Sequence, residues 1–306
     1  MDTKETQNGE AKANRTPDEV QAEVRKYRHK AVKPFFIISI ILTIAFYAGI
    51  VFLSVLEAND HPIAAFCLNA LGLPDALLKA VQRGGLLLLI ILLIYIAYKM
   101  IVANILSMKD TAVQGVEVTE TQFSDLHEAT YEYCKLLGIK KIPSVYVTTA
   151  TNPATFAKIS IYPLDAVRVS AFISSDKTGA RFALARELAR IYYKEAGVKY
   201  YLLALAGRLL PIFSSAYSRA MEYSYDRAAQ IITQSENPGE EVAKSVINYT
   251  LFRQIDFSNY QERIDRGNTP FEIMAWGYAN LYSTVPIGQF RIKAMQDPEM
   301  KDGRLF

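Results

Sequence analysis

The chain is poor in the side chains that most often bind transition metals, with 3 histidines and 2 cysteines among 306 residues. The histidines are His29, His61 and His127, which fall in three different parts of the chain. A zinc site commonly takes three or four ligands from histidine, cysteine and carboxylate side chains. The histidines are therefore too dispersed to form a three-ligand zinc site among themselves.

The sequence also lacks a strong excess of charge of one sign. Its formal net charge is +3, and the local excess of Lys and Arg lies at residues 25–33, beside a long apolar segment. A basic cluster in this position is typical of contact with anionic lipid headgroups. Nucleic-acid-binding domains instead carry basic residues across a folded surface. We therefore expect membrane lipid, and no nucleic acid, as a partner.

Two long apolar segments predict membrane helices. Residues 35–56 contain no charged side chain, and residues 84–107 contain only Lys99. At about 1.5 Å per residue, each segment can cross a hydrocarbon core of about 30 Å. The basic cluster before the first segment places the N-terminus in the cytoplasm, and two spans return the chain to that side. We expect an integral membrane protein, and the absence of organelle signals favours a bacterial inner membrane.

This topology divides the chain into three parts. Residues 1–34 are polar and of mixed charge, and we expect them to form a disordered cytoplasmic tail. Residues 35–107 comprise the two spans and a short external connector, and residues 110–306 form a cytoplasmic domain. Cys67 and Cys134 then lie on opposite sides of the membrane, which excludes a disulfide between them.

The cytoplasmic domain is predicted to be α+β and mostly helical. A helix is expected over residues 121–138, because apolar side chains recur at helical spacing and a glycine ends the pattern. Residues 143–149, 156–162 and 167–174 resemble strands and predict a small sheet. From Asp176 onward almost every segment has helical character.

One helical segment concentrates charge in the sequence Arg186-Glu187-Leu188-Ala189-Arg190. Taken alone, its charged face would ordinarily be exposed to solvent. The spacing is also that of H-E-x-x-H, in which two histidines hold zinc and the glutamate is the general base. A guanidinium group stays protonated and has no lone pair to donate, so neither arginine can replace a histidine ligand. The segment should repel zinc.

A second helical segment, residues 218–229, reads SRAMEYSYDRAA. Together with the first segment, the two spans, residues 120–147 and residues 284–292, it resembles the HtpX-like integral-membrane zinc metallopeptidases. The resemblance covers about residues 115–295 plus the spans, and it implies a zincin-like metallopeptidase domain. It also implies that Glu222 stands at the position of the third zinc ligand, with Asp226 one helical turn beyond it.

The sequence departs from this family where the chemistry would occur. Arg186 and Arg190 stand for both zinc histidines, and Val285 stands for a histidine near the C-terminus. Glu187 keeps the general-base position but has no metal-bound water to activate. The resemblance therefore implies a degenerate, non-catalytic member with no cofactor, whereas the family itself uses zinc.

We predict that a salt-bridge cluster takes the place of the metal. If the fold brings Glu222 to the face of Arg186 and Arg190, its carboxylate can accept forked hydrogen bonds from either guanidinium group. Asp226 could join this cluster. Glu187 is expected to pair with Arg190 or Lys194.

The leading hypothesis for function is a membrane-anchored pseudopeptidase that binds a protein or an extended peptide through the former substrate groove. The resemblance places the edge strand of that groove at Ala154, Thr155 and Phe156. One alternative is an active membrane metalloendopeptidase with an unorthodox site. Another is a structural membrane protein with a closed groove, which a bulky Tyr225 filling the cleft would favour. A transporter or channel has little support, because two spans with one lysine offer no polar pathway.

Overall fold

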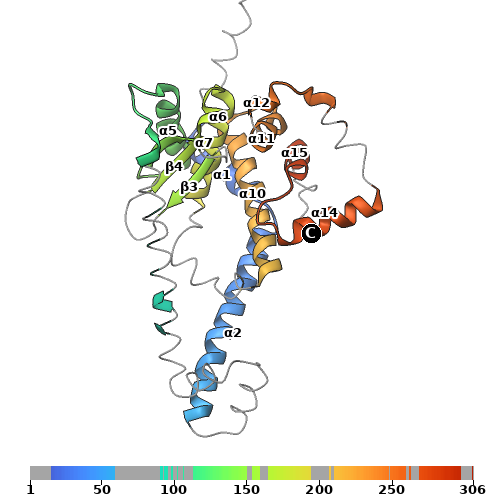
Figure 1. Ribbon diagram of the computed structural model, residues 1–306. Helices are drawn as coiled ribbons and strands as arrows, with labels where there is room; N and C mark the ends of the chain where they lie inside the picture. Colours follow the sequence, from blue (N-terminus) through green and yellow to red (C-terminus); the bar gives the residue numbers. More distant parts are fainter. Residues whose placement is uncertain are drawn as a thin grey trace, which may run out of the picture.

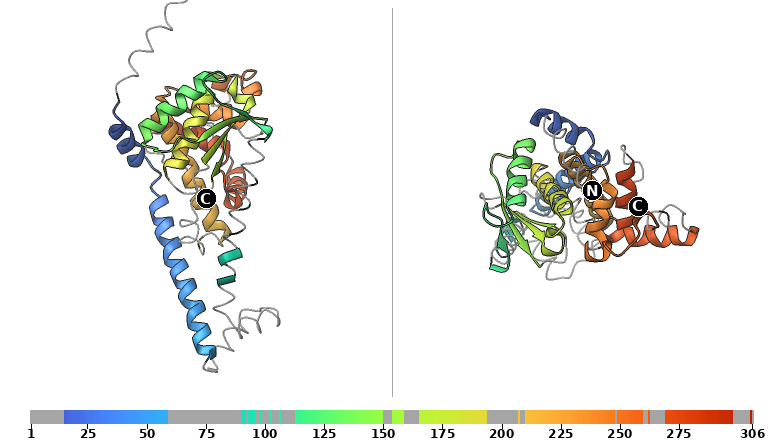
Figure 2. Two further views of the ribbon diagram at one scale, coloured as in Figure 1. Left: turned by 90° about the vertical axis from the view of Figure 1, so that its left-hand side faces the viewer. Right: turned by 90° about the horizontal axis from the view of Figure 1, so that it is seen from above.

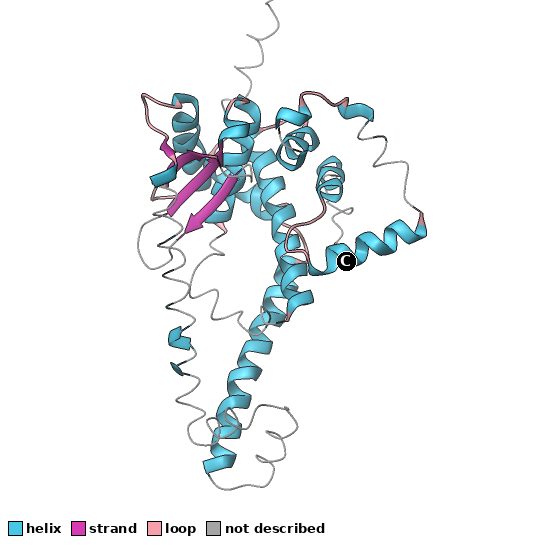
Figure 3. Ribbon diagram, viewed as in Figure 1, coloured by secondary structure: helices cyan, strands magenta, loops and turns pink. Residues whose placement is uncertain are grey.

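A computed structural model of the chain describes residues 15–58, 113–149, 154–158, 165–193, 210–247, 249–259 and 269–297, with a few single residues and short stretches besides. These residues form a mostly helical structure with one small sheet (Figure 1 and Figure 3). A long helix, α2, extends away from the folded domain, which sits at its N-terminal end (Figure 1).

Helix α2 spans Val32–Ala58 and corresponds to the first predicted membrane span. Over Val32–Gly49 this helix is long and apolar enough to cross a membrane. No other helix among the described residues has that length and composition. Its isoleucines are largely exposed in the isolated chain; Ile41 and Ile44, for example, are 59% and 61% exposed. The second predicted span, residues 84–107, and the external connector before it lie mostly outside the described residues.

The prediction of a disordered tail is wrong for the part of it that forms helix α1, Pro17–Lys26. Thr16 and Glu19 form a capping box at its start, in which each side chain accepts a hydrogen bond from the other residue's backbone N–H. Val20 and Val24 lie one turn apart, are 1% exposed and belong to the main core. These two valines explain why a mostly polar segment is folded. Residues 1–14 lie outside the described residues.

Four strands form a single sheet in the order β1-β2-β4-β3. Strand β2 pairs in parallel with β4, whereas β1 pairs antiparallel with β2 and β3 antiparallel with β4. The bounds are Val116–Glu117 for β1, Ser144–Thr148 for β2, Ala154–Lys158 for β3 and Asp165–Ser170 for β4. Strand β3 therefore ends the sheet on one side.

The strand predicted at residues 143–149 is β2, which is one residue shorter at each end, and the other two predicted strands differ more. The strand predicted at residues 156–162 begins earlier, at Ala154, and its predicted end lies outside the described residues. The strand predicted at residues 167–174 ends at Ser170, and Ala171–Ser174 forms the short helix α6. A short apolar run fits a strand and a buried helical turn equally well, so its pattern could not separate the two.

Helix α5, Ser124–Leu137, matches the helix predicted before the sheet. It ends at Gly138, whose φ of 66° lies in the left-handed region that glycine adopts without strain. Its buried face, which includes Leu126 and Leu137, belongs to the main core. The helix packs against both α1 and α7.

Helix α7, Lys177–Tyr192, lies at the centre of the domain and packs against α5, α10, α11, β3 and β4. Eleven of its 16 residues are buried, so it has no broad solvated face. The Asp176 side chain caps its N-terminus by accepting a hydrogen bond of 3.1 Å from the Gly179 N–H. Helix α10, Pro211–Thr233, runs beside α7 and reaches from the domain to α2 (Figure 1 and Figure 2).

The C-terminal third of the chain adds helices around α10. They are α11 at Pro238–Ile247, α12 at Tyr249–Phe252, α14 at Pro270–Tyr282 and α15 at Gly288–Gln296. Helix α15 packs against α11 and α10, while α14 contacts α10 and projects outward from the domain (Figure 1).

The docking of α1 gives a first testable prediction. Val24→Asp places a carboxylate in the core, which should release α1 and speed tryptic cleavage after Arg25 in the detergent-solubilised protein. A loss of about 1.4 kcal/mol in local stability raises the open fraction tenfold, so we expect at least about tenfold faster cleavage. Ala22→Asp, on the exposed face of α1, is the matched control. Equal cleavage rates for the two variants would contradict the docked position.

Candidate functional site

The candidate site lies between α7 and α10, which bring the predicted charged residues together. On α7, Arg186 and Arg190 are one helical turn apart and Glu187 lies between them. On α10, Glu222 and Asp226 are also one turn apart. Because residues four apart share a helical face, both pairs can meet where the two helices pack.

Glu222 joins the two arginines of α7. Arg190 Nη2 donates to Glu222 Oε1 at 2.9 Å, and Arg186 Nη2 donates to Glu222 Oε2. The two carboxylate oxygens are thus used by two different guanidinium groups. The predicted contact of Glu222 with both arginines is present, but each guanidinium group donates one bond to a different oxygen instead of a fork.

Asp226 is fully buried and lies between arginines from two different helices. Its Oδ1 accepts hydrogen bonds from Arg186 Nε at 2.7 Å and from Arg291 Nη2 at 2.8 Å, and its Oδ2 accepts one from Arg291 Nε at 2.8 Å. Arg291 is on α15, so this carboxylate ties α7, α10 and α15 together. Two parallel bonds from one guanidinium group are the strongest arrangement for such a pair.

Arg291 was not among the predicted site residues. A signal for it was present, because Arg291 is the arginine of the 284–292 segment on which the family resemblance partly rests. Its partner lies 65 residues earlier in the chain. Only the packing of α15 on α10 brings the two together, which helical spacing cannot predict.

Glu187 is also fully buried and pairs with both arginines of its own helix. Arg186 Nη1 donates to Glu187 Oε1 at 2.9 Å, and Arg190 Nη1 lies 3.1 Å from Glu187 Oε2. The predicted pairing with Arg190 is therefore present, while Lys194 lies outside the described residues. Glu187 is held by two cations.

We call these six residues the Arg–carboxylate network: Arg186, Glu187, Arg190, Glu222, Asp226 and Arg291. It contains three guanidinium groups and three carboxylates, so its formal charges balance. All three carboxylates are engaged by guanidinium groups, which cannot coordinate a metal. A zinc ion would have to displace arginines from the carboxylates and would gain no imidazole or thiolate ligand. These six residues do not fit zinc.

The network also sets the pKa of Asp226. Burial alone raises the pKa of a carboxyl group, because it disfavours the charged form. The guanidinium groups of Arg291 and Arg186 outweigh this effect and hold the pKa of Asp226 below its ordinary value. Asp226 is therefore ionised in the folded protein at neutral pH.

Tyr225 covers the network on the side of α2. Its side chain is 5% exposed, and the Arg190 guanidinium lies 4.7 Å from the centre of its ring. The ring also belongs to a small apolar cluster with Ala220, Met221 and Val32, the first residue of α2. Tyr225 thus connects the charged network to the beginning of the apolar helix.

The residues predicted to form a peptide-binding edge lie in strand β3. Ala154, Thr155 and Phe156 pair with Val169, Arg168 and Val167 of β4. Within the described part of the chain, β3 pairs with no other strand, so its second edge is unpaired there. Helix α7, which carries half of the network, packs against this strand. The rest of the predicted groove, residues 159–162, lies outside the described residues.

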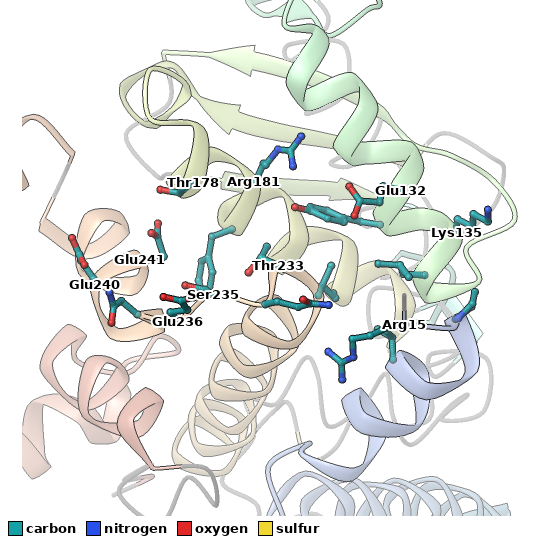
Figure 4. Close-up of a pocket in the computed structure, with 18 residues that line it drawn as sticks. Arg15, Glu132, Lys135, Thr178, Arg181, Thr233, Ser235, Glu236, Glu240 and Glu241 are labelled. Atoms are coloured by element: carbon teal, nitrogen blue, oxygen red, sulfur yellow. The ribbon is translucent and has the colours of Figure 1, made fainter. Parts of the chain in front are cut away.

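A cavity of about 800 Å³ lies elsewhere, between α1, α5, α7 and the connection from α10 to α11 (Figure 4). Its lining mixes both charge signs, with Arg15 and Lys135 toward one end and Glu240 and Glu241 at the other (Figure 4). None of the six network residues lines it. The cavity and the network are separate features of the domain.

Comparison of the chain with protein-family models, with curated proteins and with solved structures finds no match.

Removing Glu222 should destabilise the domain. Glu222→Ala removes the carboxylate that Arg186 and Arg190 share. Removing one partner of a buried ion pair lowers the free energy of unfolding by about 3 to 5 kcal/mol. We expect the lower end of this range, because the Glu222 side chain is 13% exposed. The measurement is denaturant-induced unfolding in detergent, followed by circular dichroism. Glu128→Ala, at an exposed position of α5, is the control, and equal midpoints for the two variants would rule out a stabilising network.

Stability should also fall in acid. A carboxylate whose pKa is lower in the folded state than in the unfolded state stabilises the fold at pH values above its unfolded-state pKa, which is about 3.9 for Asp. This contribution is lost as the pH falls through the folded-state pKa. We expect the melting temperature to drop as the pH falls below the unfolded-state pKa of about 3.9. Asp125→Asn is the control, because the Lys177 hydrogen bond lowers the pKa of Asp125 at the surface. The Asp125→Asn variant should show the same fall in melting temperature as the wild type. A wild-type melting temperature that stays unchanged down to pH 3 would contradict the role of Asp226.

Proposed function

We propose that this chain is a membrane-anchored, non-catalytic relative of the HtpX-like zinc metallopeptidases, with a binding or regulatory role. The observation that carries the proposal is the Arg–carboxylate network. Arg186 and Arg190 occupy the two positions where the family resemblance places zinc histidines, and Glu222 occupies the position of the third ligand. Both arginines contact Glu222, so ion pairs join the residues that would otherwise hold a metal ion.

The network removes the two requirements of metal-assisted hydrolysis. A metallopeptidase needs an ion to polarise water and a carboxylate free to take its proton. Glu187 stands at the general-base position, but both of its oxygens lie against guanidinium groups. The chain's own residues therefore favour structural support over catalysis at this position.

Strand β3 is the proposed binding element. An extended peptide can add to an unpaired strand edge through main-chain hydrogen bonds, and this requires no metal. Alternate side chains of the added strand would then face the domain and provide selectivity. The proposed partner is an extended or unfolded protein segment. The domain would bind it near the surface of the membrane that α2 enters.

The burial of Tyr225 favours a second candidate, a structural membrane protein that binds nothing in this region. Its ring packs against Arg190 and against the start of α2. In this alternative, the network and Tyr225 serve only to fix the domain to its membrane helix.

Restoring the two histidines tests the proposed relationship. Arg186→His combined with Arg190→His would place two imidazoles beside Glu222, the ligand set that binds zinc in H-E-x-x-H enzymes. We expect about one zinc per chain in this double variant and none in the wild type, measured by elemental mass spectrometry after dialysis against trace zinc. Zinc bound by the wild type would favour an active enzyme. Absence of zinc from the folded double variant would remove the support for a metallopeptidase scaffold.

Binding is tested with fluorescently labelled β-casein, an unfolded protein. The proposed function predicts that the detergent-solubilised protein raises the anisotropy of the casein without cutting it, with or without a chelator. Cleavage that a chelator abolishes would instead indicate an active metalloendopeptidase. No change in anisotropy would favour the structural alternative.

A further inference from the structure

Helix α14 exposes an apolar stripe along one face. Met274, Tyr278 and Tyr282 are 66%, 69% and 57% exposed. They follow one another at four-residue intervals, so they lie on the same side of the helix. The rings of Tyr278 and Tyr282 meet edge to face at 5.8 Å. Soluble surfaces rarely leave such a stripe uncovered unless it meets a partner or a membrane.

The position of α14 is fixed by Arg219 of α10. This arginine is fully buried, and its guanidinium group donates to the backbone carbonyls of Asn280, Leu281 and Ser283. The last carbonyls of a helix lack partners within the helix, so a guanidinium group there satisfies them and holds the helix end. The Ser215 hydroxyl adds a hydrogen bond of 3.2 Å to the Tyr282 carbonyl. The stripe is thus presented by anchored backbone.

The same part of α10 lies beside the beginning of α2. The ring of Phe213 packs edge to face against Phe35 at 4.8 Å. Leu210 and Ile212, around the start of α10, are 48% and 42% exposed. Ser215, which holds the end of α14, is two residues beyond Phe213. The anchored end of α14 therefore lies close to the level at which the apolar helix leaves the domain.

The figures place α14 across the direction of α2, on the side of the domain from which α2 descends (Figure 1 and Figure 2). A helix transverse to a membrane span, at the level of its entry, runs along the membrane surface. The sequence of α14 contains one charged residue, Glu272, among 13. Both its orientation and its composition suit the boundary between headgroups and acyl chains.

We propose that α14 and the first turn of α10 form a membrane-contact surface that rests on the lipid bilayer crossed by α2. Tyrosine is enriched at membrane interfaces because its ring is apolar and its hydroxyl is polar. An amphipathic helix lying in this plane buries its apolar face into the headgroup and acyl boundary. The exposed apolar surface of α2 continues into this face through Leu210 and Ile212. The contact fixes the height and tilt of the domain; it rests on the membrane anchoring in the proposed function and not on the loss of catalysis.

A tryptophan on the stripe would report this contact. Trp276 is the single tryptophan of the sequence and lies in α14. It is two residues from Met274 and from Tyr278 and so does not share their face of the helix. Trp276→Phe therefore removes it, and Tyr282→Trp places the probe on the stripe. We would reconstitute this full-length variant into vesicles of phosphatidylcholine and phosphatidylglycerol, with and without brominated acyl chains. The contact predicts that the brominated lipid quenches most of the emission from position 282 and that aqueous iodide quenches little of it.

Variants separate membrane contact from other causes of shielding. Tyr278→Asp combined with Met274→Asp should reduce bromine quenching and increase iodide quenching at least about twofold, since charged side chains are costly below the headgroups. Tyr131→Asp, at a 51% exposed position of α5, should leave both unchanged. Emission from position 282 that is insensitive to bromine but open to iodide would overturn the proposal. Shielding from both quenchers that disappears on dilution of the protein in lipid would also overturn it, in favour of a second copy of the chain.

Discussion

The burial of Asp226 is the constraint on which the arrangement of the helices depends. An isolated carboxylate inside a protein is very unfavourable, so it must be neutralised or paired. Asp226 is paired twice, by Arg186 on α7 and by Arg291 on α15. The two arginines are buried with it, and each in turn requires an anion. The helices that carry these charges therefore have to pack in one relative position, or several charges would be left unpaired.

The network extends this constraint toward the membrane. Arg190 is shared between Glu222 and the face of Tyr225, and the other contacts of Tyr225 include the first residue of α2. Helix α10 also contacts α2 at a second point, where Phe213 packs against Phe35. The apolar helix thus continues from a rigid part of the domain and is not joined to it by a free linker. Helix α1 strengthens this junction, because its buried valines fix the chain that leads into α2.

Features that depend on local spacing could be predicted from the sequence. Helix α5 and its end at Gly138 followed from apolar periodicity and a glycine. The contact of Arg186 and Arg190 with Glu222 was expected from the family resemblance, which implies that Glu222 stands at the third-ligand position. Features that depend on tertiary contact were missed. Arg291 pairs across 65 residues, Val20 and Val24 are two apolar side chains in a polar segment, and α6 continues an apolar run that resembled a strand.

An ion-pair network and a metal site can serve the same mechanical purpose but depend on different conditions. A metal site needs deprotonated ligands and available metal, and it loosens when either is missing. The network needs only that its carboxylates stay ionised, and the lowered pKa of Asp226 keeps that carboxylate ionised in more acidic solution than is usual for Asp. Helix α7 carries half of this network and also packs against β3 and β4. If the edge of β3 binds an extended segment, as proposed, the network keeps the support beneath that edge rigid whether or not zinc is present. If the proposed relationship to zinc peptidases also holds, arginine in place of both histidines removes the chemistry of the site and preserves the surface beside it.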